Sequence, residues 1–464
     1  MGAWQEEASS RSMAAHVTAG VAVLMLCAPA LRAQSAAYQP DWDSLDRRPI
    51  PAWFDKAKFG IFIHWGVYSV PAWGPRGKES GWYGFEMNKA GSPTARFHAA
   101  TYGEHFTYAD FAEMFKAELF DAAEWARLFQ RAGARYVVLT AKHHDGYCLW
   151  PSAMSPQWNS MDTGPRRDLV GELTKAVRDR GLRMGLYYSL YEWYHPLLRE
   201  HRSIYTGRHM FPQLTELVES YAPDLLFADG EWDYNSRAWK SREFLAWLFN
   251  ESAVREHVVI NDRWGNDTRS RHGGYFTSEY GHVDAGKKLD DSHKWEECRA
   301  IGKSFIYNRS ERAEDYRGAR ELVHLLVDIV SRGGNLLLDV GPAADGRIPV
   351  IMQERLVEIG EWLKVNGEAI YGTKPWRESK EGENVCYTAG KHGAVYAISL
   401  GWPGRELVLS VPKAGAGASA TLLGRLDGLK TRTDGGKLII EVPPLSVEEV
   451  PCQHAYAFKL TGVE

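Results

Sequence analysis

The segment PDLLFADGEW, residues 223–232, carries an apolar run directly into two carboxylates. Its residues 225–227 are typical of a buried β-strand. Asp229 and Glu231 follow, with only a glycine between them. Because burying an unpaired carboxylate is unfavourable, the carboxylate at this strand tip is expected to face a polar partner or a pocket. The tip of this strand is therefore the first candidate for a functional site.

The same alternation of short apolar runs and longer amphipathic stretches continues through most of the chain. Near-continuous apolar strands separated by helices predict a parallel sheet that is covered on both faces. Eight such strands fit an α/β fold, a (β/α)8 TIM-like barrel, with function at the C-terminal ends of the strands. A doubly wound open sheet is the alternative, but no GxGxxG follows the first strand. The expected strands are 59–66, 135–146, 183–190, 224–230, 257–265, 274–281, 303–308 and 335–342.

Helical periodicity is clearest in five of the stretches between and after these strands. The connections after the fifth and sixth strands are too short for clear helices, so the strand count is least constrained there. The expected helices are 108–133, 168–181, 212–223, 316–334 and 350–367.

The pattern of hydrophobic and turn-forming residues changes after residue 376. Helical patterns stop, and short β-prone runs alternate with glycine, proline and aspartate turns. We therefore expect the barrel over residues 34–372, followed by a small antiparallel β-sandwich over residues 373–464.

The N-terminal residues 1–33 have the shape of a secretory signal peptide, a short apolar stretch followed by small residues. The apolar run is too short to span a membrane. Glu6 and Glu7 are atypical for such a signal, which favours a start at Met13. Export to a periplasmic, extracellular or lysosome-like compartment is expected, and no membrane span.

The composition is that of a globular protein, with 44% hydrophobic and 25% charged residues. The net charge of -4 does not suggest a nucleic-acid partner. The 18 Trp and 22 Tyr residues fit either carbohydrate stacking or large aromatic cores. Five scattered cysteines form no disulfide framework and have no CxxC zinc spacing.

Two carboxylates on neighbouring strand tips would suit retaining glycoside hydrolysis, in which one acts as nucleophile and the other as proton donor. Asp229 is the first candidate, and a helix cap or a loop salt bridge is its structural alternative. Glu279, at the end of the sixth expected strand, fits as the partner by position. Glu296, in a charged stretch expected to be helix-like, is the rival, and a salt bridge is its simpler role.

Histidines also follow strands, and His, His and Asp in KHHDG are all metal ligands. However, adjacent residues of an extended segment point to opposite faces, so His143 and His144 are not expected to share one ion. Hydrogen bonding to sugar hydroxyls is the preferred interpretation, with a structural role close behind. His64 followed by Trp65 combines a donor with a stacking surface. We expect no metal and no cofactor.

Seven stretches, which cover residues from about 40 to 376, carry a resemblance to a known family. They are GIFIHWGVYSVPAW, VLTAKHHDGYCLW, GLYYSLYEWYHP, PDLLFADGEW, HKWEEC, GKSFIYNR and GGNLLLDVGPAADGRIP. Taken together and in this order, they resemble the α-L-fucosidases of glycoside hydrolase family twenty-nine. The resemblance implies a retaining exo-enzyme that releases terminal α-L-fucose from a fucosylated oligosaccharide or glycoconjugate. A carbohydrate-binding protein that kept the pocket and lost catalysis is the alternative function, and self-association into a homo-oligomer stays open.

The resemblance also implies roles for individual residues. The family's nucleophile falls on Asp229. For the acid/base, Glu279 matches the bacterial-type pattern better, whereas Glu296 belongs to the signature KWExC, whose Cys298 we interpret as structural. The residues that would bind the sugar are His64, Trp65, His143, His144, Tyr188 and Arg263.

Two departures from the family pattern fall in the sugar pocket. Gly81 stands where members often carry the glutamate of SEWY, and Glu79 can replace that glutamate only if the loop bends. Phe227 stands where members usually have Trp, two residues before the nucleophile. Gly81 and Phe227 are therefore expected to affect substrate preference more than the hydrolytic reaction itself.

Overall fold

The computed structural model describes residues 37–282 and 292–464, and Tyr38–Glu464 form one compact unit. The expected signal peptide over residues 1–33 lies outside the described part of the chain.

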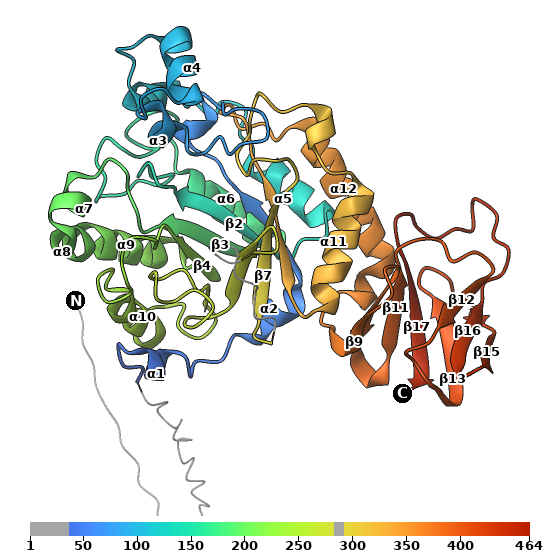
Figure 1. The fold of residues 1–464 in the computed structure, drawn as a ribbon. Coiled ribbons are helices and arrows are strands. Elements are labelled where there is room, and N and C mark those ends of the chain that lie inside the picture. Colours follow the sequence, from blue (N-terminus) through green and yellow to red (C-terminus); the bar gives the residue numbers. More distant parts are fainter. Residues whose placement is uncertain (1–36, 283–291) are drawn as a thin grey trace, which may run out of the picture. The chain divides into compact units, whose positions relative to one another are not determined.

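In the described ranges, eight parallel strands form one curled sheet in the order β5-β4-β3-β2-β1-β8-β7-β6. Figure 1 shows β2, β3 and β4 of this sheet side by side. Its edge strands are linked by a backbone hydrogen bond of 3.1 Å from Tyr275 N to Ile260 O. The predicted TIM-like barrel is confirmed. The strands are β1 Phe59–Ile63, β2 Tyr136–Lys142, β3 Arg183–Ser189, β4 Leu225–Asp229, β5 Val259–Ile260, β6 Phe276–Glu279, β7 Trp295–Ala300 and β8 Asn335–Val340.

Both faces of the barrel strands are buried, which explains their near-continuous apolar sequences. All residues of β1, β2, β4 and β8 are buried. Alternate residues pack outward with the helices or inward into a cluster rich in aromatic rings. In β3, for example, Tyr187 belongs to the inner cluster and Leu186 and Tyr188 to the outer core.

Two of the helices that cover the sheet begin at capping residues visible in the sequence. The Asp121 carboxylate accepts hydrogen bonds from two backbone N–H groups at the start of α5, and that of Asp168 accepts one from Gly171 in α6. The described α-helices are α1 Trp42–Leu45, α2 Ala52–Ala57, α3 Tyr83–Met87, α4 Pro93–Tyr102, α5 Ala122–Arg131, α6 Leu169–Asp179, α7 Pro196–Glu200, α8 Arg202–Tyr205, α9 Phe211–Tyr221, α10 Ser241–Asn250, α11 Ala319–Ser331 and α12 Val350–Asn366.

Shorter helical turns fill several connections. Five of those in residues 37–282 and 292–464 are 3-10 helices: η1 Val67–Ser69, η2 Tyr108–Met114, η5 Ala313–Asp315, η6 Gly367–Ala369 and η7 Lys391–Gly393. One, η3 Thr206–Met210, is a π-helix that runs directly into α9.

The single helix expected over residues 108–133 is wrong. The segment is divided into η2 and α5 by an irregular stretch in which Ala117 has a φ of 50°. There, the N–H groups of Ala117 and Leu119 donate to the carbonyls of Ala344 and Asp345. These long-range hydrogen bonds replace the ones that a continuous helix would make.

The seventh strand is not where the sequence predicted it. Residues 303–306 form bends and residues 307–308 have no regular structure, whereas β7 is the charged stretch Trp295–Ala300, which the sequence analysis expects to be helix-like. A strand tolerates these buried carboxyl groups because they are hydrogen-bonded: Glu296 accepts from Tyr136, and Glu297 accepts from Ser278. Tertiary partners therefore override the local pattern.

Beyond the barrel, antiparallel strands form a six-stranded sheet, β14-β13-β17-β11-β10-β9, and a three-stranded sheet, β12-β16-β15. Buried side chains from both sheets share one apolar cluster, which makes this region a β-sandwich. Its strands are β9 Lys374–Glu381, β10 Val385–Ala389, β11 Val395–Ser399, β12 Glu406–Leu409, β13 Ala414–Leu422, β14 Gly428–Leu429, β15 Thr431–Asp434, β16 Lys437–Glu441 and β17 Tyr456–Val463.

The other face of the six-stranded sheet packs into the core of the barrel. Trp362 of α12 donates to Ala455 O at 2.8 Å, and Ala457 N donates to Asn366 Oδ1 at 3.3 Å. Within the described ranges, no helix is long and apolar enough to cross a membrane.

Candidate active site

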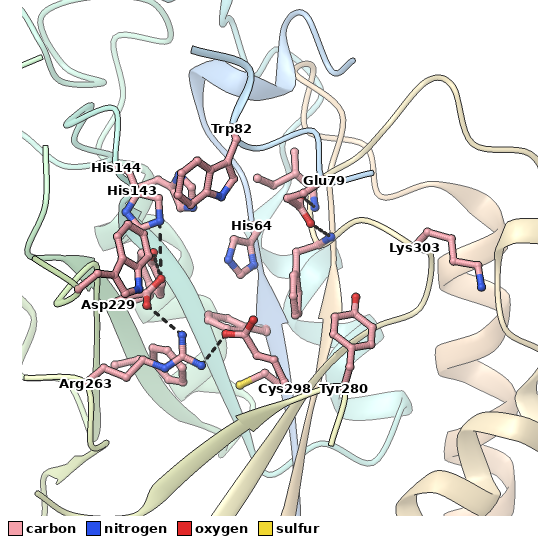
Figure 2. A pocket seen from close by; sticks show the side chains of 17 residues that line it. His64, Glu79, Trp82, His143, His144, Asp229, Arg263, Tyr280, Cys298 and Lys303 are labelled. Carbon is pink, nitrogen blue, oxygen red and sulfur yellow. Dashed lines mark hydrogen bonds and ion pairs between the residues drawn. The ribbon is translucent and has the colours of Figure 1, made fainter. Parts of the chain in front are cut away.

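A cavity of about 360 Å³ lies at the C-terminal ends of the barrel strands (Figure 2). Six residues predicted from the sequence line it together, from five different strands or the loops that follow them. They are His64, His143, His144, Asp229, Arg263 and Glu279.

Asp229 is a buried, ionised carboxylate held by hydrogen bonds. Its Oδ2 accepts from the Tyr187 hydroxyl at 2.7 Å, and its Oδ1 accepts from Arg263 Nη1 at 2.9 Å. Burial alone would raise the pKa of Asp229, but the positive charge of Arg263 lowers it to about 2. The chain leaves the strand through Gly230 at a φ of 75°, where a Cβ would lie 2.8 Å from Tyr191 Cβ. Glycine thus permits the sharp turn that presents the carboxylate.

Arg263 connects the two candidate catalytic carboxylates. The guanidinium Nη1 faces Asp229, while Nη2 donates to Glu279 Oε1 at 2.5 Å. The Arg263 side chain is 4% exposed, whereas that of Glu279 is 40% exposed. The cavity therefore has one carboxylate at its buried end and one toward solvent, both within reach of a single guanidinium.

The three histidines are uncharged hydrogen-bonding groups. Burial lowers the pKa of His64 to about 3 and that of His144 to about 4, and it lowers that of His143 as well. His64 Nδ1 lies 2.6 Å from Asp339 Oδ1, and His144 Nδ1 lies 2.7 Å from Ser189 Oγ. A neutral imidazole can donate or accept, which suits contact with sugar hydroxyls.

The expectation that His143 and His144 point to opposite faces is wrong. Both line the cavity, with ring centroids 4.1 Å apart, because β2 ends at Lys142 and the pair lies in the turn beyond it. The two-residue alternation of a strand no longer applies there.

Two residues predicted to bind substrate lie outside the cavity. Trp65 is buried against Phe115, Phe120 and Trp125. Tyr188 points away from the barrel interior and donates to Gln213 at 2.8 Å. Its neighbour Tyr187 faces the cavity instead, since successive strand residues alternate. Of the two tyrosines in YYS, the sequence analysis chose Tyr188, but the register of β3 turns Tyr187 toward the cavity.

Glu296 does not reach the cavity either. It pairs with Asn335, the first residue of β8, at the N-terminal end of the barrel. There it accepts a hydrogen bond from the Tyr136 hydroxyl, and burial raises its pKa to about 7. Cys298, two residues later on the same face of β7, is buried and does line the cavity.

Comparisons with known proteins agree with this geometry. The family model described as α-L-fucosidase matches residues 25–368, and that of the α-L-fucosidase C-terminal domain matches residues 379–461. The chain belongs to the α-L-fucosidase family. It is accordingly a glycoside hydrolase.

Relatives within the family cover nearly the whole chain. The tissue α-L-fucosidase of Homo sapiens is 48% identical over 441 residues, 92% of each chain, and the α-L-fucosidase of Dictyostelium discoideum is 44% identical over 451 residues, 93% of this chain and 96% of the relative. The crystal structure of Thermotoga maritima α-fucosidase in complex with fucose superposes with a TM-score of 0.78 at 37% identity, covering 91% of this chain and all of that one.

Glu79 lines the cavity next to Gly81, the first departure from the α-L-fucosidase pattern. The loop bends so that the Glu79 carboxylate lines the cavity and accepts from Gly81 N at 3.2 Å and from Ser304 Oγ at 2.7 Å. A Cβ on Gly81 would lie 1.8 Å from Ile306 Cδ1, so the loop is built around a glycine. In the sequence, the absence of the family's glutamate at position 81 indicates Glu79 as the candidate to replace it.

The second departure from the α-L-fucosidase pattern, Phe227, lines the cavity as the usual Trp would be expected to do. Its ring is nearly parallel to that of Tyr187, with centroids 5.8 Å apart, and the Arg263 guanidinium lies 5.0 Å from its centroid. Phe227 thus supports the two residues that hold Asp229.

A third carboxyl, Glu231, lies close to Asp229 and was not predicted as a site residue. It is 1% exposed, with Arg269 Nη1 at 3.3 Å from its Oε1. Burial and the charge of Asp229 raise the pKa of Glu231 to about 8, so it keeps its proton at neutral pH. Asp229 is therefore the charged member of this pair.

Proposed function

We propose that the chain is a retaining exo-α-L-fucosidase, with Asp229 as nucleophile and Glu279 as general acid/base. The observation that carries the proposal is the pair of carboxylates on Arg263, one buried and ionised and the other open to solvent. Retaining hydrolysis requires two carboxylates with such different environments.

In the first step, an oxygen of Asp229 attacks C1 of the fucosyl residue while the bond from C1 to the leaving oxygen breaks. Protonated Glu279 gives its proton to that oxygen, so the aglycone departs as an alcohol. The product is a fucosyl ester of Asp229. Neutral His64, His143 and His144 hold the sugar hydroxyls without competing for the charge on Asp229.

In the second step, water enters from the open side, where Glu279 is 40% exposed. Glu279 removes a proton from the water, whose oxygen attacks C1 and breaks the ester bond. Two inversions at C1 give net retention, and both carboxylates return to their starting states.

The proposed substrate is a terminal α-L-fucosyl residue of an oligosaccharide or glycoconjugate. The cavity of about 360 Å³ is at the small end of ligand sites, which suits one terminal sugar ring. The related Thermotoga maritima enzyme has been crystallised with fucose.

An aryl α-L-fucoside, followed by proton NMR from the first minutes, tests this function. We expect release of the aryl alcohol with α-L-fucose as the first anomer, with and without a chelator. Initial β-L-fucose would contradict retention. Absence of release at every pH would instead indicate a carbohydrate-binding protein on a degenerate barrel.

We also propose that the chain is exported and that its signal is residues 1–33. One relative, 46% identical over 456 residues, is the plasma α-L-fucosidase of Rattus norvegicus. N-terminal sequencing of the secreted protein should begin shortly after residue 30. Full-length protein retained in the cytosol would contradict export.

A further inference from the structure

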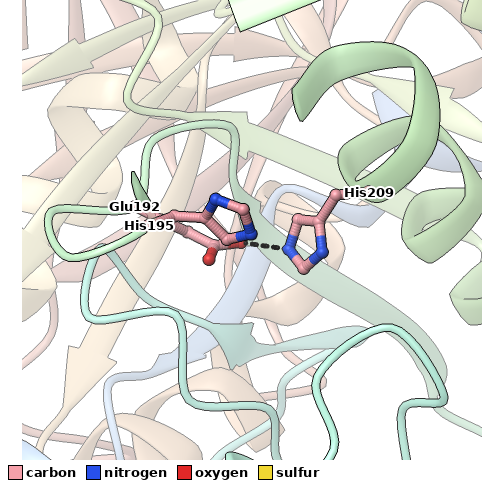
Figure 3. A group of neighbouring side chains, drawn as sticks. All are labelled: Glu192, His195 and His209. Carbon is pink, nitrogen blue, oxygen red and sulfur yellow. Dashed lines mark hydrogen bonds and ion pairs between the residues drawn. The ribbon is translucent and has the colours of Figure 1, made fainter. Parts of the chain in front are cut away.

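A second cavity, of about 690 Å³, holds a cluster of metal-binding side chains that the proposed reaction does not use. Glu192, His195 and His209 each offer a ligand atom, and these atoms lie within 4.8 Å of one another. Figure 3 shows His209 directed at the Glu192 carboxylate, with His195 beside it. Glu192 and His209 are buried, and His195 is half-buried. We propose that this cluster is a binding site for a divalent transition-metal ion such as Zn²⁺.

The donor set matches that chemistry. Two imidazoles and one carboxylate are a common ligand set for Zn²⁺, with water in the remaining position. The imidazole centroids of His195 and His209 are 4.3 Å apart. His195 Nδ1 is buried and has no hydrogen-bond partner among the described residues. The cavity beside the cluster leaves room for the water ligand.

The walls of the cavity favour a cation. Its lining includes three carboxylates and three histidines but, in the described part of the chain, neither lysine nor arginine. Besides the cluster itself, these are Glu104, Asp145 and His98, and His98 is already engaged by the Tyr83 hydroxyl and Phe106 O. A cation entering this space meets net negative charge.

Lys142 contacts the same carboxylate oxygen of Glu192 as His209 does. Its Nζ lies 2.5 Å from Glu192 Oε1, and the Tyr205 hydroxyl donates to the same oxygen at 3.2 Å. Such contacts fix the orientation of a ligating carboxylate. The ammonium would share the Glu192 carboxylate with the metal, and Asp145, which also lines the cavity, adds a second buried carboxylate beside the cluster.

The backbone at this place connects the site to the wall of the active-site cavity. Glu192 and His195 lie in the loop after β3, and His209 lies in the π-helix η3, a kind of irregularity often found at functional sites. The loop also carries Trp193, whose N–H donates to His144 O at 2.8 Å. A bound ion would therefore cross-link η3 to a loop that supports His144.

Metal binding can be measured on the untagged protein after dialysis against a chelator. Titration with Zn²⁺, followed by calorimetry and metal analysis, should show one ion per chain, and Co²⁺ should give visible d–d absorption bands. His195→Ala and His209→Ala should each weaken Zn²⁺ binding by more than about 100-fold. Zn²⁺ should also raise the Tm of the wild type but not that of these variants.

The exposed His201 is the matched control, because it is on the same connection but outside the cluster. His201→Ala should bind Zn²⁺ as the wild type does. Circular dichroism and aryl-fucosidase turnover report folding of each variant independently of metal. If the wild type binds no more Zn²⁺ than a folded His195→Ala/His209→Ala double variant, the site does not exist.

Discussion

Arg263 gives the two catalytic candidates different environments. By facing Asp229 at the buried end and Glu279 at the exposed end, one guanidinium stabilises the negative nucleophile and leaves the acid/base next to solvent. Glu231 adds no second charge, because its raised pKa keeps it protonated at neutral pH. A single negative charge at the buried end is what attack on C1 requires.

The nucleophile assignment predicts the behaviour of Asp229→Gly. Turnover of an aryl α-L-fucoside should fall by more than about 1,000-fold, since the covalent route is lost. Sodium azide should restore part of the rate and give fucosyl azide, because the small anion fits the space left by the carboxylate. A variant that keeps a tenth of the wild-type rate would show that another residue is the nucleophile.

The acid/base assignment predicts a difference between Glu279→Ala and Glu296→Ala. Loss of the proton donor should cost about 100- to 10,000-fold on substrates with poor leaving groups and far less on activated aryl fucosides. Glu279→Ala should show this dependence. Glu296→Ala should lower stability without any dependence of the rate on the leaving group, because Glu296 lies at the opposite end of β7 from the cavity. If kcat/KM of Glu296→Ala depends on the leaving group and that of Glu279→Ala does not, Glu296 is the acid/base.

At the scale of elements, the parallel strands bring residues from distant parts of the sequence to one edge. The C-terminal ends of β1, β2 and β4 each carry a cavity residue immediately beyond or at the last strand residue. Sequence alone predicted this, because apolar strands that end in polar residues repeat along the chain. It could not assign Tyr187 over Tyr188, since that depends on the register of β3.

β7 shows where sequence reasoning fails. Its charged residues do not give the apolar pattern that predicts a strand. The burial of Glu296 and Glu297 is explained only by their hydrogen-bond partners, which come from β2 and β6. The Glu79 loop is a similar case, because Ile306 and Ser304 from a distant loop determine its bend. Contacts between elements, rather than local patterns, decide both features.

The burial of Glu296 in β7 predicts a pH-dependent stability. Its folded pKa of about 7 lies above its ordinary value of 4.5, so its contribution is present below pH 4.5 and is lost as the pH rises through 7. Relative to Glu296→Gln, the wild type should lose about 3 kcal/mol between pH 4.5 and pH 8. Urea unfolding at both pH values measures this difference.

The exposed Glu448 provides the control for that measurement. Glu448→Gln should follow the wild type at both pH values. An unfolding free-energy difference between Glu296→Gln and wild type that does not change with pH would show that Glu296 is ionised throughout.

At the scale of the whole molecule, the sandwich and the barrel share a core. Buried residues of the six-stranded sheet, such as Ile398 and Ala457, belong to the same apolar cluster as Leu356 and Trp362 of α12. The sequence predicted both the barrel and the sandwich, and the structure identifies the residues through which the two pack together.

We therefore predict that barrel and sandwich unfold in one cooperative transition. Trp362→Phe removes the hydrogen bond to Ala455 O and part of the buried ring, and should lower stability by about 1–2 kcal/mol. Calorimetry should show a single peak, shifted to lower temperature, that coincides with the loss of aryl-fucosidase activity. Leu426→Ala, at a fully exposed position of the sandwich, should leave that peak unchanged. Two separate peaks, with activity following only one, would instead mean that the sandwich unfolds independently and that the junction at Trp362 contributes little to the stability of the active site.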